Sequence, residues 1–142
     1  MTLSDFIARH RAPLLGLADR PGCAASPRWT QLLLHWFAAA ATDPDTALSE
    51  RRIRPVLLCL ARLLLCECTF ITGGEGAHTH VVPVPAGSGH GHAAAAIRDL
   101  LACLAARDPE LAGTLSAEIA ARIRADFAAV DSKVRAHPSV KG

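Results

Sequence analysis

Four of the seven histidines lie close together in the middle of the chain, as two His-x-His pairs: His78 with His80, and His90 with His92. Imidazole is a common ligand of zinc, copper and nickel. Residues two positions apart on a β-strand point to the same side, so His78 and His80 could bind one metal ion. His90 and His92 could do so only if Gly91 is extended, because their side chains would diverge on a helix.

A Cys66-Glu67-Cys68 triplet precedes these histidines, and Glu75 stands between the triplet and the first pair. Thiolate and carboxylate groups can complete a metal site, so we consider Cys68 and Glu75 as additional ligands. Alternatively, Cys66 and Cys68 pack like small hydrophobic residues at the end of an apolar helix. The sequence contains neither paired C-x-x-C motifs nor H-E-x-x-H, which makes a polar loop without a ligand the main alternative to a Zn, Cu or Ni site.

Glycines alternate with other residues at positions 87, 89 and 91, directly before the alanine-rich start of a predicted helix. Backbone amides at such a helix start can bind an anion. The lysine of a P-loop is missing, however, and neither G-x-G-x-x-G nor G-x-S-x-G is matched. We therefore favour a flexible connector here over a nucleotide-binding loop or a nucleophile elbow.

No set of residues suggests acid–base catalysis. Asp99, Glu118 and Asp126 fall beside the apolar stripes of their predicted helices, which indicates solvent-exposed carboxylates. His10 lies on the apolar stripe of the first predicted helix, and His35 lies beside the tryptophan face of the second. We interpret both as partly buried, hydrogen-bonded histidines rather than catalytic bases. The sequence therefore predicts no catalytic residue.

The composition is that of a globular protein: 142 residues, 51% hydrophobic and 20% charged, enough for one domain with a sizeable core. The net charge of +2 is small, and Arg51, Arg52 and Arg54 do not form one compact patch, which argues against nucleic acid. Five cysteines without a secretory signal favour reduced thiols and a cytoplasmic location. The longest apolar run, 56–66, is too short to insert into a membrane.

Hydrophobic periodicity predicts a mainly α fold, an irregular bundle of five to six helices. The segment at about 55–67 is apolar on nearly every side, so we place it as a buried central helix. Strand-like residues on both sides of a glycine cluster predict a small β-hairpin or ordered loop inserted at about 68–84. The other helices are expected at 3–18, 27–40, 93–107 and 114–135, with a charged turn or short helix at 44–54.

Local signals indicate where these helices begin and break. Ser4 is a candidate cap for the first helix, and Pro13 should kink that helix or end its first part. Asp43-Pro44 and Asp108-Pro109 each indicate a further helix start, with aspartate as the cap and proline at the first helical position. Pro55 and Gly113 are expected to separate helical segments. We expect residues 1–136 to form a single helical domain, with 72–92 as a Gly/Pro/His-rich insertion and 137–142 as a flexible tail.

These observations favour a non-enzymatic helical module that binds another protein or itself, as a subunit, adaptor, chaperone or inhibitory partner. The preference rests on amphipathic helices without a catalytic constellation. A deep polar pocket with converging His and Asp side chains would argue against it. The alternative is a transition-metal-binding protein that uses His78, His80, His90 and His92. Nucleic acid and membrane are not expected partners.

Overall fold

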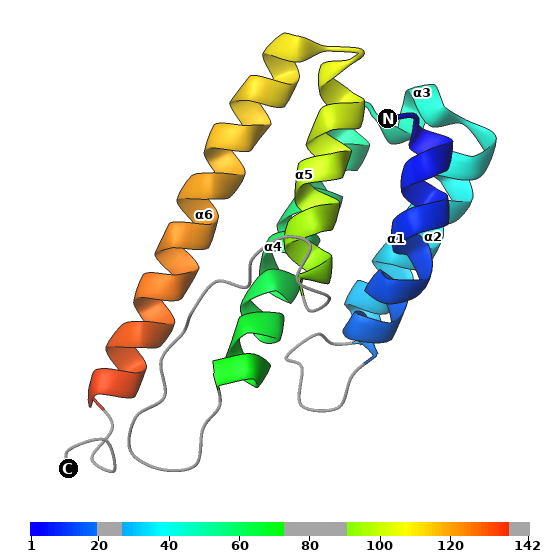
Figure 1. The fold of residues 1–142 in the computed structure, drawn as a ribbon. Helices are drawn as coiled ribbons and strands as arrows, with labels where there is room; N and C mark the ends of the chain where they lie inside the picture. Colours follow the sequence, from blue (N-terminus) through cyan, green and yellow to red (C-terminus); the bar gives the residue numbers. More distant parts are fainter. Residues whose placement is uncertain (20–26, 73–90, 137–142) are drawn as a thin grey trace.

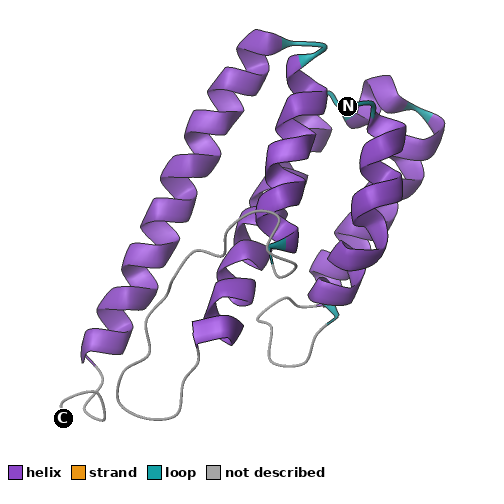
Figure 2. Ribbon diagram, in the orientation of Figure 1, coloured by secondary structure: helices purple, strands orange, loops and turns teal. Residues whose placement is uncertain are grey.

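The computed structural model describes residues 1–19, 27–72 and 91–136, without the side chains of 27, 68–72 and 130–136. Within these ranges the chain forms helices and no β-strand (Figures 1 and 2). The helices are α1 (Leu3–Ala18), α2 (Pro27–Thr42), α3 (Pro44–Ala47), α4 (Glu50–Thr72), α5 (His92–Ala105) and α6 (Pro109–Ala136). The predicted helical bundle is confirmed.

The start of α1 is capped by Thr2 rather than by the predicted Ser4. The Thr2 hydroxyl accepts a hydrogen bond from the backbone N–H of Asp5 at 3.1 Å. In return, the Asp5 carboxylate accepts one from the backbone N–H of Thr2 at 3.3 Å. This reciprocal capping box satisfies two backbone donors that the first helical turn leaves without a partner.

Two further helices begin at an Asp-Pro pair, as the sequence indicates. Asp43 precedes α3 and accepts a hydrogen bond from the backbone N–H of Thr46 at 3.2 Å. Asp108 precedes α6 and accepts one from the backbone N–H of Leu111 at 3.0 Å. Proline suits the first helical position because the N–H that it lacks would have no helical partner there.

The predicted breaks at Pro55 and Gly113 are wrong. Helix α4 runs through Pro55 and α6 runs through Gly113, just as α1 continues past Pro13. Each proline removes one backbone hydrogen bond. Burial of the adjoining Leu14 and Val56, both 1% exposed, offsets that loss. The true interruption comes earlier, at residues 48–49 between α3 and α4.

The first strand of the predicted hairpin is also wrong, because residues 68–72 form the last part of α4. Strand propensity is a weak local preference, whereas a helix that is already formed extends by one hydrogen bond per added residue. The remaining part of the predicted hairpin, 73–84, lies outside the described residues.

Helices α4 and α5 form the middle of the bundle, with α1 and α2 on one side and α6 on the other (Figure 1). Helix α6 packs on both α4 and α5, and α1 packs on α5. The α4 side chains Ile53, Leu57, Leu60 and Leu63 are 0% exposed, which confirms that this helix is central. Within the part of the chain described, no helix is both long and apolar enough to cross a membrane.

Aromatic and small residues fix how the flanking helices approach this centre. Phe6 of α1 packs against both Trp36 and Phe37 of α2, with ring centroids 5.9 Å and 6.3 Å away. The Trp36 indole N–H donates to the carbonyl of Ala47 at 3.1 Å, which ties α2 to α3. At the start of α5, Ala93 and Ala96 are 0% exposed, so neighbouring helices pack directly against the α5 backbone.

Candidate functional site

A buried histidine–aspartate pair joins α1 to α5. His10 Nε2 lies 2.7 Å from Asp99 Oδ2, and the two residues are only 5% and 6% exposed. This confirms the interpretation of His10 as a buried, hydrogen-bonded histidine. The prediction that Asp99 is solvent-exposed is wrong, since α5 is covered by α1 on the side where Asp99 lies.

Two arginines complete the cluster around Asp99. Arg9 Nη1 lies 3.3 Å from Oδ2, and Arg98 Nε lies 3.3 Å from Oδ1. Burial alone raises the pKa of Asp99, but the hydrogen bonds from His10 and Arg98, with the positive charge of Arg98, outweigh burial and hold this pKa below its usual value. Asp99 is therefore an anion at neutral pH, and His10 Nε2–H donates to it.

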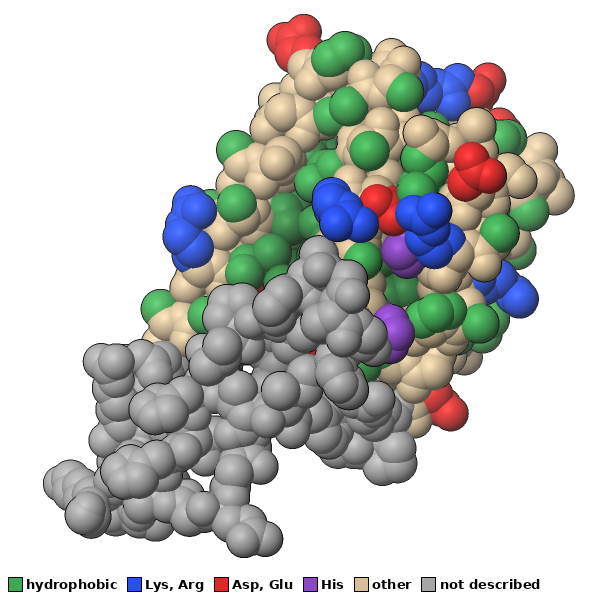
Figure 3. Space-filling model, viewed as in Figure 1, with side chains coloured by type: hydrophobic (Ala, Val, Ile, Leu, Met, Phe, Trp, Pro, Cys, Tyr) green, Lys and Arg blue, Asp and Glu red, His purple; other side chains and the backbone are tan. Residues whose placement is uncertain are grey.

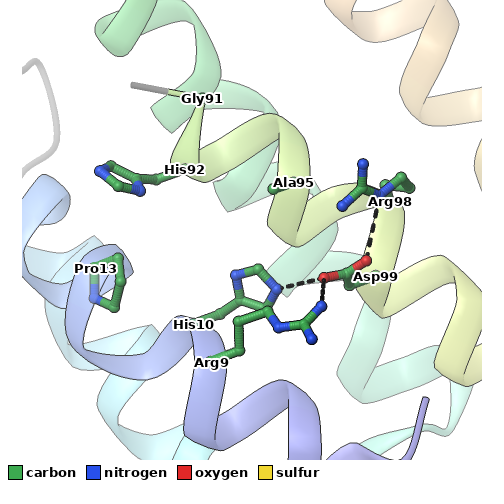
Figure 4. A pocket seen from close by; sticks show the side chains of 8 residues that line it. All are labelled: Arg9, His10, Pro13, Gly91, His92, Ala95, Arg98 and Asp99. Carbon is green, nitrogen blue, oxygen red and sulfur yellow. Dashed lines mark hydrogen bonds and ion pairs between the residues drawn. The ribbon is translucent and has the colours of Figure 1, made fainter. Parts of the chain in front are cut away.

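This arrangement directs the other nitrogen of the His10 ring into a pocket. Nδ1 forms no hydrogen bond with the described residues, and no side-chain nitrogen or oxygen among them is both buried and without a partner. Nδ1 therefore reaches open space. Figure 4 shows it on the side of the ring that is turned toward His92.

The pocket lies between α1 and the start of α5 and has a volume of about 340 Å³. In the space-filling view, arginine side chains flank an acidic group on this face, with histidines beside them (Figure 3). The residues that line the pocket are Arg9, His10, Pro13, Gly91, His92, Ala95, Arg98 and Asp99 (Figure 4).

The start of α5 is occupied by the protein's own carboxylate. Glu67 of α4 is 2% exposed, and its two oxygens accept the backbone N–H groups of His92 at 3.0 Å and Ala93 at 3.3 Å. A carboxylate at this position favourably meets the positive end of the helix dipole. The anion-binding role that the sequence allowed for this helix start is thus filled by Glu67. Cys66, beside Glu67, is buried and matches the packing alternative.

Of the four predicted metal ligands, only His92 lies among the described residues. It begins α5, is half-buried and shares the pocket with His10. Its neighbour Gly91 has φ −88° and ψ 48°, so the extended backbone that a His90–His92 pair needs is not found at Gly91. His78, His80 and His90 lie outside the described residues, as does Glu75.

No group of three or more metal-ligating side chains gathers within the ranges that the structure describes. The metal site therefore stays a prediction.

A second concave surface lies between α2 and α4, with a volume of about 520 Å³. We call it the α2–α4 groove. Its lining residues are Arg28, Trp29, Gln31, Leu32 and His35 from α2, and Pro55, Leu58 and Cys59 from α4. The prediction that His35 is partly buried is wrong, because His35 is exposed at the rim of this groove.

The other two carboxylates considered for catalysis are in ion pairs. Glu118 pairs with Arg54, and Asp126 lies 3.3 Å from Arg122. Their side chains are 39% and 16% exposed, so Glu118 agrees better with the predicted solvated position than Asp126 does.

Burial of Asp99 was not predicted, although the sequence carries a signal for it. Counting from His92, positions 92, 96, 99 and 103 follow the spacing of one helical face, and Ala96 and Cys103 on it are buried. This stripe of small residues beside the leucine stripe marks a second buried side of α5. Alanine and cysteine contribute little to the hydrophobic periodicity of a helix, so the pattern alone does not reveal this stripe.

Comparison of the chain with protein-family models, with curated protein sequences and with solved structures found no match. The two surfaces therefore have to be interpreted from their own chemistry.

Proposed function

We propose that this chain is a non-enzymatic protein-interaction module that binds an acidic, amphipathic helix of a partner protein in the α2–α4 groove. Such a module acts as a subunit, adaptor, chaperone or inhibitory partner. The observation that carries the proposal is a groove with apolar walls, a basic rim and no carboxylate among the described residues that line it.

The apolar walls support recognition of a helix. Trp29 and Leu32 are packed against the core yet remain half-buried at the groove, and Leu58 is 36% exposed. Amphipathic helices dock into such grooves through side chains spaced three, four and seven positions apart. Covering Trp29, Leu32 and Leu58 in this way removes apolar surface from water, which supplies the main binding free energy.

The charges at the rim support an acidic partner. Arg28 lies at the start of α2, and Arg51 lies near the start of α4, seven residues before Leu58 and on the same helical face. Among the described residues, no carboxylate forms an ion pair with Arg28 or Arg51. Cations near a helix N-terminus are unfavourable to that helix, so a negatively charged partner gains from meeting them.

The pocket at His10 and Asp99 does not favour catalysis over binding. The carboxylate of Asp99 already accepts hydrogen bonds or ion pairs from His10, Arg9 and Arg98. Among the described residues that line the pocket, none supplies a hydroxyl or thiol nucleophile for His10 to activate. The His10–Asp99 pair therefore does not indicate an enzyme, and the interaction module stays the function that is best supported.

Binding of designed peptides tests the proposal. One labelled peptide carries leucines at helical spacing with glutamates elsewhere, and a second carries lysines in place of the glutamates. We expect the acidic peptide to bind with a micromolar Kd, measured by fluorescence anisotropy. Leu58→Glu should weaken this binding at least about tenfold, because it places a charge on the apolar wall and repels the peptide.

Leu34→Glu is the matched control. Leu34 is 40% exposed and lies on α2, but it does not line the groove. We expect this variant to bind the acidic peptide like the wild type. Equal binding of the acidic and basic peptides, equal losses in the two variants, or absence of binding would each overturn the proposal.

A further inference from the structure

The pocket between α1 and α5 carries an excess of positive charge. Arg9 and Arg98 share one carboxylate, that of Asp99, and approach its two different oxygens. Each guanidinium has five N–H donors, and the structure gives each only one such contact. The two side chains are 60% and 61% exposed, so their remaining donors are accessible to a ligand. Guanidinium donors are the groups that recognise carboxylate and phosphate.

His10 adds a ring nitrogen to the same pocket. Because Nε2–H donates to Asp99, Nδ1 is the ring nitrogen left to meet a ligand. His10 is only 5% exposed, and its ring packs against that of Phe6, with the ring centroids 4.8 Å apart. Its orientation is therefore fixed before any ligand arrives. A hydroxyl group can both donate and accept a hydrogen bond, so it is the natural partner for Nδ1.

The backbone N–H groups at the start of α5 are not available to bind the anionic group of such a ligand. The N–H groups of His92 and Ala93 are already used by Glu67. Recognition must come from the side chains, with Pro13 and Ala95 available for contact with carbon atoms. A volume of about 340 Å³ admits a molecule of a few carbon atoms.

We propose that this pocket binds a small hydroxylated oxyanion. Its carboxylate or phosphate group is held by Arg9 and Arg98, and its hydroxyl forms a hydrogen bond with Nδ1 of His10. This site is separate from the α2–α4 groove, since the two share no lining residue within the described part of the chain.

The first test compares pairs of probes that differ by the hydroxyl. Glycolate and acetate form the carboxylate pair, and 2-hydroxyethyl phosphate and ethyl phosphate form the phosphate pair. Titrations are followed by the imidazole nitrogen signals of His10 in the full chain. In at least one pair the hydroxylated probe should bind about fivefold or more tightly, the value of one hydrogen bond. The pair with the tighter binding identifies the oxyanion.

Arginine variants form the second test. Arg9→Gln and Arg98→Gln should each weaken binding of the better probe about tenfold, because each removes a charged donor from an exposed position. Arg11→Gln is the matched control, since Arg11 is exposed on the same helix as Arg9 but does not line the pocket. We expect it to bind like the wild type.

Three results would overturn the inference: no saturable shift of the His10 signal at millimolar probe, equal binding within both pairs, or equal losses in Arg11→Gln and Arg98→Gln. Leu58→Glu, which tests the groove, should leave this binding unchanged. Failure of one proposal is thus distinguishable from failure of the other.

Discussion

At the scale of single residues, the buried charge of Asp99 is the most consequential feature. An unpaired carboxylate at this depth would be costly, and the contact with His10 at 2.7 Å is what compensates it. The arginine contacts contribute less, because both guanidinium groups are mostly exposed and are screened by water. The His10–Asp99 contact therefore stabilises the packing of α1 on α5 as well as orienting the pocket.

Asp99→Asn tests this role. We expect a loss of about 1–3 kcal/mol in the free energy of unfolding near neutral pH, because a neutral amide is a weaker acceptor. The pKa of Asp99 is lowered in the folded state, so its stabilisation is present above the ordinary carboxyl pKa of 3.8 and is lost as pH falls through the folded value. The difference in unfolding free energy between variant and wild type should therefore shrink in acid. Urea unfolding at neutral pH and at a pH below 3.8 measures it.

Asp45→Asn is the control for this experiment. Asp45 pairs with Arg107, but its side chain is 79% exposed, so the change should stay within about 0.5 kcal/mol. A wild-type advantage over Asp99→Asn that does not change with pH would contradict the role assigned to the Asp99 charge.

At the scale of elements, α6 shows how burial of a helix outweighs a poor helix former. Gly113 lies inside this helix and is exposed. Its neighbours Ala112 and Leu115 are buried, at 6% and 0% exposed. Leu115 and Ile119 pack into the core, so continuing the helix through Gly113 buries more apolar surface than breaking it.

Gly113→Ala should accordingly stabilise the protein. A Cβ at this position would meet no atom within 4 Å, and alanine loses less backbone freedom on folding than glycine. We expect about 0.5–1 kcal/mol of added stability, seen as a higher Tm in thermal unfolding. Gly16→Ala in α1 is an independent check, because its added Cβ also meets nothing within 4 Å. A lower Tm for Gly113→Ala would contradict a continuous α6.

At the scale of the whole molecule, the two proposed sites lie between different pairs of helices. The groove is formed by α2 and α4, and the pocket by α1 and α5, with the hydrophobic core between these pairs. Each site depends on how helices that are distant in sequence are placed side by side (Figure 1).

The metal-binding alternative concerns the metal content of the full chain after purification. It predicts about one equivalent of Zn, Cu or Ni in protein made without a histidine tag. Simultaneous replacement of His78 and His80 by alanine should remove that metal, whereas His35→Ala should retain it. Elemental analysis measures both, and wild-type protein without stoichiometric metal would contradict the alternative.

The sequence by itself determined the helical class of this protein, the central position of the apolar helix and most helix starts. These features depend on hydrophobic spacing along one helix or on caps a few residues away, as at Asp43 and Asp108. It did not predict that α4 continues through Pro55 to Thr72, because burial by the other helices decides that extension.

Only the tertiary structure decided the sites. His10 and Asp99 are 89 residues apart in sequence, and Glu67 reaches the start of α5 across 25 residues. Local pattern cannot show that two such polar groups will meet, since each alone resembles an ordinary surface or core residue. Packing of α1 and α4 against α5 removes water from these groups, and only then does each require the other as its hydrogen-bond partner.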